Sequence, residues 1–346
     1  MKAITRNSSF ELLRLILMLM IIIHHSIVFG MGLSGLGLQF DGQFPMHFNH
    51  AEQPVATILN CLCICAVNCF ILISGYFGIK PSLKKFLPLV VCIILYTLFF
   101  NTIFLAAEGN YRRAVSSLMI FSHTYYWFVT YYLYLMIFAP ALNHIFERFN
   151  RNYLYLIMGT MLFISCYLGF LWGESTNTSG YTFFQFIFMY CIGRYIKKYS
   201  IRVSRNKAIV LYAIPAILTG LTMYLLWMYG KNELAWRMTY YNNPLIIISS
   251  IGLFTFFSTI KLNNNLINRL ASSAFAIYLV QSSLLCSDVY YPFINNLQTK
   301  SGYWIWAIII ISSLVIIAFS ILIDQIQKPI NNLIVTYALK HLNKWK

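Results

Sequence analysis

The sequence predicts an all-α fold, a polytopic bundle of about ten transmembrane helices. Of its 346 residues, 59% are hydrophobic and only 10% are charged, whereas a soluble domain carries about a quarter charged residues. A water-soluble globule of this size would lack the polar surface to cover it, so lipid is the natural solvent for the remaining apolar surface. No segment resembles an appended soluble domain, and we predict a single membrane domain over residues 1–346.

Ten apolar runs are the candidate spans, and most approach the ~20 residues that cross the hydrocarbon core. The first run contains Arg14 and lacks a clear small-residue cleavage site, so it is predicted to be a permanent span and not a signal peptide. The sixth run is short, which indicates little tilt or a partly re-entrant segment. In chain order the runs are residues 9–30, 55–79, 86–107, 125–143, 153–172, 182–196, 208–229, 244–260, 272–290 and 303–323.

The basic residues predict the orientation of these spans. The net charge of +16 does not indicate nucleic-acid binding, because the lysines and arginines form short clusters between apolar runs and not one stripe. With the N-terminus inside, 19 of the 25 basic residues fall in inner segments. The outer loops hold only Arg112, Arg113, Lys231, Arg237 and Lys300. This bias predicts that both termini are cytoplasmic.

Four of the eight cysteines lie in the second apolar run. A spacing of four residues places Cys61, Cys65 and Cys69 near one helix face, so a metal site is conceivable there. The same run contains no His, Asp or Glu, and a thiolate in lipid needs a metal or a cation beside it. We therefore favour packing roles for these side chains, Cys63 included, and expect no metal.

The longest outer loop, residues 31–54, is rich in glycine and contains Pro45. This composition makes the loop flexible enough to act as a lid over the bundle. A plain connector between the first two spans explains the same composition equally well.

Charged and titratable side chains inside the first span are candidates for function. Glu11, Arg14, His24 and His25 lie in or beside the hydrocarbon, where a charge costs about 2.5–3.5 kcal/mol on insertion scales. Eleven positions separate Arg14 from His25. At ~100° per residue the two side chains point to within roughly 20° of the same direction, about 16 Å apart along the helix axis. Glu11 lies within ~40° of that face, whereas His24 points elsewhere.

Two readings of this polar face stay open. Arg14 could reach the inner lipid phosphates with Glu11 as its i,i+3 partner, and His25 could be a satisfied interface residue. The alignment of all three favours function, because histidine transfers protons near neutral pH and arginine binds phosphate bidentately. The arrangement suits a long donor whose phosphates stay near the cytoplasm while its reactive end reaches into the bundle.

Four segments, in order along the chain, resemble the membrane acyltransferase-3 family, whose members O-acylate cell-surface glycans. The opening Phe10–Arg14, followed by His25, is similar to that family's Leu-Asp-x-Leu-Arg pattern and its histidine about eleven residues on. The other three are Phe70–Phe77, Tyr126–Phe128 running to Pro140, and Ser273–Leu279. Each segment alone is common in membrane helices, and it is their order together with the span count that makes the resemblance specific.

The chain departs from the family pattern at three places. Glu11 stands where aspartate is usual, which keeps the charge. Lys84 and Lys85 stand where the family often has arginines, which keeps the positive charge but loses the bidentate phosphate geometry. Gln281 ends the late segment where the family often has a histidine, which argues against proton transfer at that position.

The resemblance implies an enzyme of the bacterial cytoplasmic membrane that takes an acyl group from acyl-CoA, with acetyl-CoA the expected donor. The acceptor would be a hydroxyl of a surface polysaccharide or of its lipid-linked oligosaccharide precursor. His25 would act as the general base or briefly carry the acyl group, while Glu11 and Arg14 orient each other and Arg14 holds phosphate or polarises the donor. Lys84 and Lys85 would attract the CoA phosphates electrostatically.

Three further residues are candidates for the walls of a donor tunnel. Ser74, Tyr76 and Trp127 lie in the resembling segments, although packing explains these residue types as well. Gly75 beside Ser74 also permits a close helix approach that needs no catalysis.

A transporter or flippase for a glycan or a small anion is the main alternative function. It explains the span count and the buried charges, but a transporter should show paired broken helices in two symmetric halves, and the sequence shows no such symmetry. A purely structural membrane subunit explains the hydropathy but not the polar face of the first span. The sequence therefore favours a transmembrane O-acetyltransferase that acts beside membrane lipid and binds no nucleic acid.

Overall fold

The computed structural model describes residues 7–33, 52–119, 126–173, 177 and 179–342. These residues are predominantly helical and contain no β-strand. Within them, seven helical segments are long and apolar enough to cross a membrane, and a bent pair of segments would make an eighth. The seven are Ser8–Gly30, Gln53–Phe77, Leu83–Ala107, Trp127–Arg148, Arg151–Trp172, Arg205–Met228 and Trp304–His341. The all-α, multi-pass membrane fold predicted from the sequence is confirmed.

The predicted count of about ten spans is higher than the seven or eight that the described residues support. The difference lies in α9 (Phe183–Lys198) and α12 (Pro244–Ser258), which have 16 and 15 residues. At ~1.5 Å per residue these helices are about 24 and 22 Å long, shorter than the ~30 Å hydrocarbon core. Much of each helix is buried against other helices, so its apolar character reflects packing inside the bundle as much as contact with lipid.

Several spans combine two or more helical segments. The first is α1 (Ser8–His25) followed by the π-helix η1 (Ser26–Gly30), and the second is α2 (Gln53–Ile64) followed by α3 (Ala66–Phe77). The remaining elements up to α8 are α4 (Leu83–Thr97), η3 (Leu98–Thr102), α5 (Ile103–Ala107), α6 (Tyr111–Ser117), α7 (Trp127–Arg148) and α8 (Arg151–Leu162). Those that follow are η4 (Phe163–Trp172), α10 (Arg205–Met228), α11 (Asn232–Arg237), α13 (Asn265–Ala271), α14 (Ala274–Gln281), η5 (Cys286–Tyr290), α15 (Tyr291–Ser301) and α16 (Trp304–Leu342).

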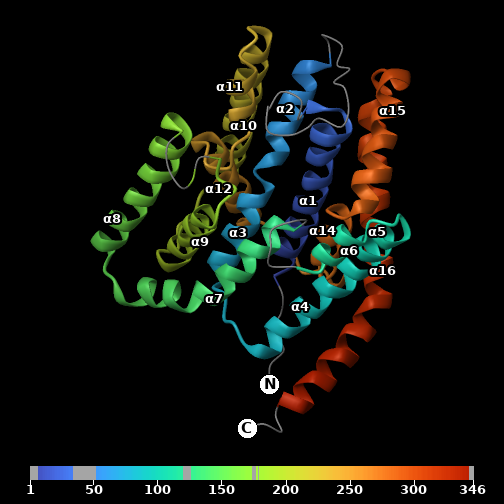
Figure 1. Ribbon diagram of the computed structural model, residues 1–346. Coiled ribbons are helices and arrows are strands. Elements are labelled where there is room, and N and C mark those ends of the chain that lie inside the picture. Colours follow the sequence, from blue (N-terminus) through green and yellow to red (C-terminus); the bar gives the residue numbers. More distant parts are fainter. Residues whose placement is uncertain (1–6, 34–51, 120–125, 174–176, 178, 343–346) are drawn as a thin grey trace.

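Helix α1 occupies the middle of the bundle (Figure 1). The Asn7 side chain caps its first turn by accepting a hydrogen bond from the backbone N–H of Ser9 at 3.1 Å. Leu13, Leu17 and Ile22 are at most 1% exposed, because α1 packs against α2, α3, α12, α13, α14 and α16. A span surrounded in this way is shielded from lipid over most of its length, so its polar residues face protein.

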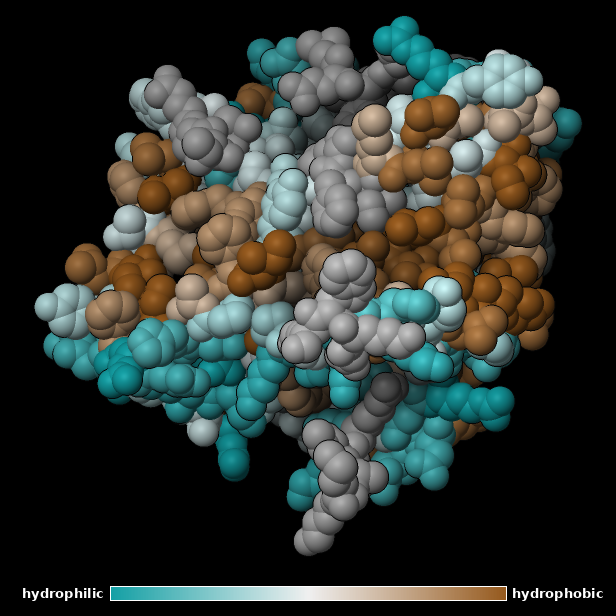
Figure 2. Space-filling view, turned by 60° about the horizontal axis from the view of Figure 1, so that its bottom comes forward, coloured by the Kyte–Doolittle hydropathy of each residue, from teal (hydrophilic) through white to brown (hydrophobic). Residues whose placement is uncertain are grey.

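The outer surface is that of a protein that lies in a membrane. Figure 2 shows a brown apolar band across the molecule, with teal polar surface gathered below it. Large apolar side chains are exposed on the outward faces of α10 and α16, for example Leu225 at 51% and Leu322 at 66%. The N-terminal end of α1 and the C-terminal end of α16 lie on the same side of the bundle (Figure 1).

Two glycines let α3 and α9 cross at very short range. A Cβ atom added at Gly75 would lie 2.2 Å from the backbone oxygen of Tyr190, and one added at Gly193 would lie 2.4 Å from the backbone oxygen of Leu72. No side chain fits between backbones this close, so the small residues are required for the crossing. Gly75 therefore has the packing role considered for it from the sequence, and this crossing fixes the position of Ser74 beside it.

Candidate active site

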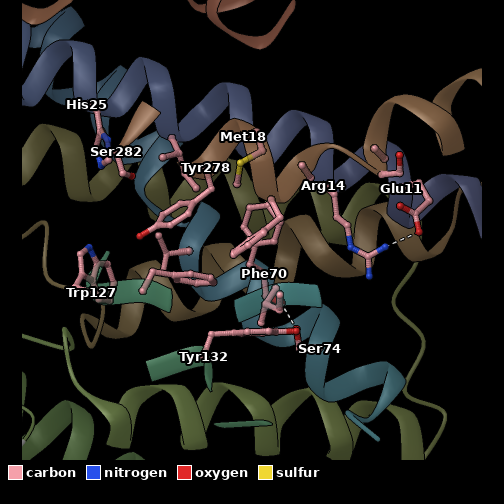
Figure 3. A pocket seen from close by; sticks show the side chains of 18 of the residues that line it. Glu11, Arg14, Met18, His25, Phe70, Ser74, Trp127, Tyr132, Tyr278 and Ser282 are labelled. Atoms are coloured by element: carbon pink, nitrogen blue, oxygen red, sulfur yellow. Dashed lines mark hydrogen bonds and ion pairs between the residues drawn. The ribbon is translucent and has the colours of Figure 1, made fainter. Parts of the chain in front are cut away.

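A cavity of about 520 Å³ runs along α1 inside the bundle (Figure 3). Its volume falls in the ~300–1,000 Å³ range of small-molecule sites. Glu11 and Arg14 line one end of it and His25 lines the other. Met18 and Ile21 of α1 also line it. Its remaining walls come from α3, α4, α7, α13, α14 and loop segments, through Val67, Phe70, Ser74, Leu89, Trp127, Phe128, Tyr132, Tyr241, Ala271, Ser272, Ala274, Phe275, Tyr278 and Ser282.

The structure brings Glu11, Arg14 and His25 to one face of α1, as the helical spacing predicts. Arg14 Nη1 donates to Glu11 Oε1 at 2.5 Å, and the side chains are 30% and 9% exposed. The pairing confirms the expected i,i+3 contact, and it also holds the guanidinium at the end of the cavity away from His25 (Figure 3). His24 lies off this face and is bonded through Nδ1 to Asn60 Oδ1 at 2.6 Å.

The position of the proton on His25 follows from its partner. His25 Nδ1 lies 2.6 Å from Gln281 Oε1, and an amide oxygen only accepts hydrogen bonds, so Nδ1 carries the proton in the neutral ring. The amide orientation is consistent with its other bond, in which Gln281 Nε2 donates to Ser282 Oγ at 2.5 Å. Nε2 of His25 is therefore the basic nitrogen of a side chain that lines the cavity, beside Ser282 (Figure 3).

Gln281 reaches His25 because the late span is broken at this point. Helix α14 ends at Gln281, the chain resumes helix near Cys286, and the two parts are bent by 63°. Asn101 Oδ1 accepts the backbone N–H of Leu284 at 3.0 Å and so satisfies a donor that the break leaves without a helical partner. The sequence showed Gln281 only as a departure from the family pattern, and no local signal paired it with a residue 256 positions away.

An aromatic wall lines the cavity at the His25 end. The rings of Trp127 and Tyr241 stack at 5.8 Å, and Tyr181 lies 4.9 Å from Trp127 and 4.4 Å from Tyr241. The backbone of Tyr241 is fixed on both sides, since its carbonyl accepts from Asn68 Nδ2 at 2.9 Å and from Gln185 Nε2 at 3.0 Å. These two hydrogen bonds hold the Tyr241 part of the wall in place. Trp127 was among the predicted tunnel residues, whereas Tyr241, 114 residues further along the chain, was not.

Ser74 and Tyr76, the other two predicted tunnel residues, differ in whether they reach the cavity. Ser74 lines the cavity and donates to the carbonyl of Phe70 at 3.1 Å, with the Tyr132 hydroxyl at 3.4 Å (Figure 3). Tyr76 is not among the lining residues and packs against Phe10 and Phe254 at 5.6 and 5.3 Å between ring centroids. The packing role is thus the one that the structure shows for Tyr76.

The lysine pair expected at the inner mouth lies apart from the cavity walls. Lys84 and Lys85 are exposed at the start of α4, and neither lines the cavity. Lys85 Nζ donates to the backbone oxygen of Lys80 at 3.1 Å, so its ammonium is turned to its own connecting segment. Leu89, one turn further along α4, is the residue of this helix that reaches the cavity.

The four cysteines of the second span do not line this cavity. The thiols of Cys61, Cys63, Cys65 and Cys69 are free and buried, and Cys69 Sγ donates to the carbonyl of Ser250 at 3.2 Å. Among the described residues, no group of three or more His, Cys, Asp or Glu side chains is placed to hold a metal ion. Residues 34–51 of the suggested lid lie outside the described part of the chain.

Comparison with protein families gives one match that covers most of the sequence. The family model described as an acyltransferase domain, that of the acyltransferase-3 family, matches residues 7–324. The match includes every side chain that lines the cavity. Neither the curated proteins nor the solved structures that were compared give a match. Because this match covers most of the chain, the chain belongs to the membrane acyltransferase-3 family.

Proposed function

We propose that the protein moves an acetyl group from cytoplasmic acetyl-CoA to a hydroxyl of a surface glycan or of its lipid-linked precursor. The observation that supports this most is the cavity that joins Arg14 to His25 along α1. The proposal places the enzyme in a bacterial cytoplasmic membrane with both termini inside. The inward bias of the basic residues and the shared side of the two chain ends (Figure 1) support that orientation.

The cavity suits a donor that is long and charged at one end. Arg14 would bind a phosphate through the guanidinium N–H groups that Glu11 does not use. The apolar middle, with Met18 and Phe70, would hold the pantetheine arm. The ~16 Å between Arg14 and His25 along the helix would then bring the thioester to the imidazole.

His25 would act as the general base. Its Nε2 accepts the proton of the acceptor hydroxyl, whose oxygen attacks the thioester carbonyl carbon. The carbon–sulfur bond breaks, and the departing thiolate takes the proton back from the imidazolium, so the products are an acetyl ester and free CoA. Gln281 keeps Nδ1–H bonded throughout, and Glu11 positions Arg14, which holds the donor.

The reaction can be tested on the glycans of the host. Cells that lack the protein are expected to lose O-acetyl groups from one surface glycan by mass spectrometry, and the wild-type chain is expected to restore them. Membranes supplied with acetyl-labelled acetyl-CoA should transfer the label to the same glycan. Unchanged acetylation in the deletion strain would reject the proposal, and loss of acetylation without label transfer would reject acetyl-CoA as the donor.

Gln281→Leu is expected to lower acetyl transfer roughly tenfold to a hundredfold, in the range seen when the group that orients a functional histidine is lost. The leucine leaves Nδ1–H without an acceptor, so the ring loses its tautomer and its orientation. Gln281→Glu restores an acceptor oxygen and should recover most of the rate. The measurement is initial rate with acetyl-CoA saturating. Equal rates for Gln281→Leu and wild type would show that the 2.6 Å contact has no part in the reaction.

A further inference from the structure

The turn between α13 and α14 bounds the end of the cavity where Glu11 and Arg14 lie. Ala271, Ser272, Ala274 and Phe275 all line the cavity, and Ser272 is exposed. The cavity therefore reaches the molecular surface at this turn. Arg14, which is 30% exposed, lines the same end from α1.

A lysine ammonium lies directly behind this rim. Lys328 Nζ, from α16, donates to Ser272 Oγ at 2.9 Å and to Ser273 Oγ at 3.3 Å. It also lies 2.6 Å from Asp324 Oδ2, one helical turn back on α16. The Asp324 side chain is 5% exposed and that of Lys328 is 36% exposed. The buried Asp324 carboxylate thus holds the Lys328 ammonium in place. The ammonium is still open to solvent, and it contacts the hydroxyl of Ser272, which lines the cavity.

We infer that Lys328 binds a phosphate of the donor nucleotide at this rim. The inference rests on the proposed acyl-CoA donor. An ammonium gains more from a charge-assisted bond to a phosphate oxygen than from two neutral hydroxyls, so phosphate would replace the serine contacts while Asp324 keeps Lys328 in position. Ser272 Oγ keeps its own hydrogen bond to the carbonyl oxygen of Arg269 at 2.7 Å.

The geometry favours Lys328 over the lysine pair that the sequence suggested. Lys328 contacts a residue of the cavity wall, whereas Lys85 is bonded to the backbone of Lys80. Helix α14 also begins at this rim, at Ala274, so the positive end of its dipole adds to the field of the lysine. Phosphates held here leave the pantetheine arm directed along the cavity toward His25.

Binding measurements on the purified full-length protein in detergent can distinguish contacts to the nucleotide from contacts to the acyl arm of the donor. Lys328→Met is expected to weaken acetyl-CoA binding about tenfold or more, because a charge-assisted bond is lost. S-acetylpantetheine, which lacks the nucleotide phosphates, should bind the variant and the wild type equally. Lys328→Arg should keep the affinity for acetyl-CoA.

Two controls deal with misfolding and with general charge. The double variant Asp324→Asn, Lys328→Met leaves no unpaired buried carboxylate and should show the same selective loss of acetyl-CoA affinity. Lys340→Met removes a charge from the exposed end of the same helix and should change nothing. Equal acetyl-CoA affinity of the double variant and the wild type would overturn the role of Lys328 but not the proposed function. A wild type that binds S-acetylpantetheine but not acetyl-CoA would overturn both the role of Lys328 and the proposed CoA donor.

Discussion

Replacing His25 with Ala is expected to lower acetyl transfer by about 10²- to 10⁴-fold, the range that a positioned general base contributes. The side chain lines the cavity, and its Nδ1 is held by Gln281, which leaves Nε2 as the basic nitrogen. No other histidine among the described residues lines the cavity to take its place. The measurement is initial transfer of labelled acetyl from acetyl-CoA to the host glycan, at equal amounts of folded protein.

The neighbouring histidine offers a matched control. His24 bonds to Asn60 at 2.6 Å and does not line the cavity. His24→Gln preserves a polar partner for Asn60, and its transfer rate should stay within about threefold of wild type, as expected of a substitution outside the reacting groups. Full activity of His25→Ala would remove the proposed base, and a matching loss in both variants would indicate that the first span tolerates no change at this depth.

Gly75→Ala is expected to destabilise the bundle by about 1–3 kcal/mol or more, as overpacking of a filled interior does. The new methyl group would lie 2.2 Å from the backbone oxygen of Tyr190, and a backbone atom cannot swing aside as a flexible side chain can. Helices α3 and α9 must separate to admit it. Thermal unfolding in detergent, followed by circular dichroism, should show a clearly lower midpoint for the variant.

Gly159→Ala is the control for a glycine in an exposed helix. A Cβ atom at Gly159, in α8, meets nothing within 4 Å. Alanine there should leave stability unchanged or raise it by about 0.4–1 kcal/mol, because the unfolded chain loses freedom and the helix gains propensity. If Gly75→Ala unfolds at the same temperature as Gly159→Ala, the tight crossing of α3 and α9 is not required for folding.

The crossing also links stability to the site. Phe70 and Ser74 of α3 line the cavity, and Gly75 follows them directly. Any outward shift of α3 therefore widens the cavity opposite Arg14 and His25. We expect Gly75→Ala to lose acetyl transfer even at temperatures where most of the protein stays folded, because productive geometry tolerates displacements of only about 1 Å.

The sequence by itself determined the features that depend on a single helix, namely its hydropathy and which of its residues share a face. Hydropathy identified the membrane class and the helical segments, and the turn angle of an α-helix placed Glu11, Arg14 and His25 along one face. It could not separate a span from a short buried helix, since α12 is as apolar as a span but has only 15 residues. An apolar side chain packs favourably against other helices and against lipid alike, so hydropathy does not tell the two environments apart.

Only the tertiary structure decided which residues from distant segments meet around the cavity. Gln281 lies 256 positions from His25, and Lys328 lies 56 positions from Ser272, so no periodicity relates them. Lys84 and Lys85 carried the expected charge, yet the connecting segment turns Lys85 toward Lys80. Helix geometry is local and can be read from the spacing of residues, whereas the contacts between helices depend on how every span packs at once.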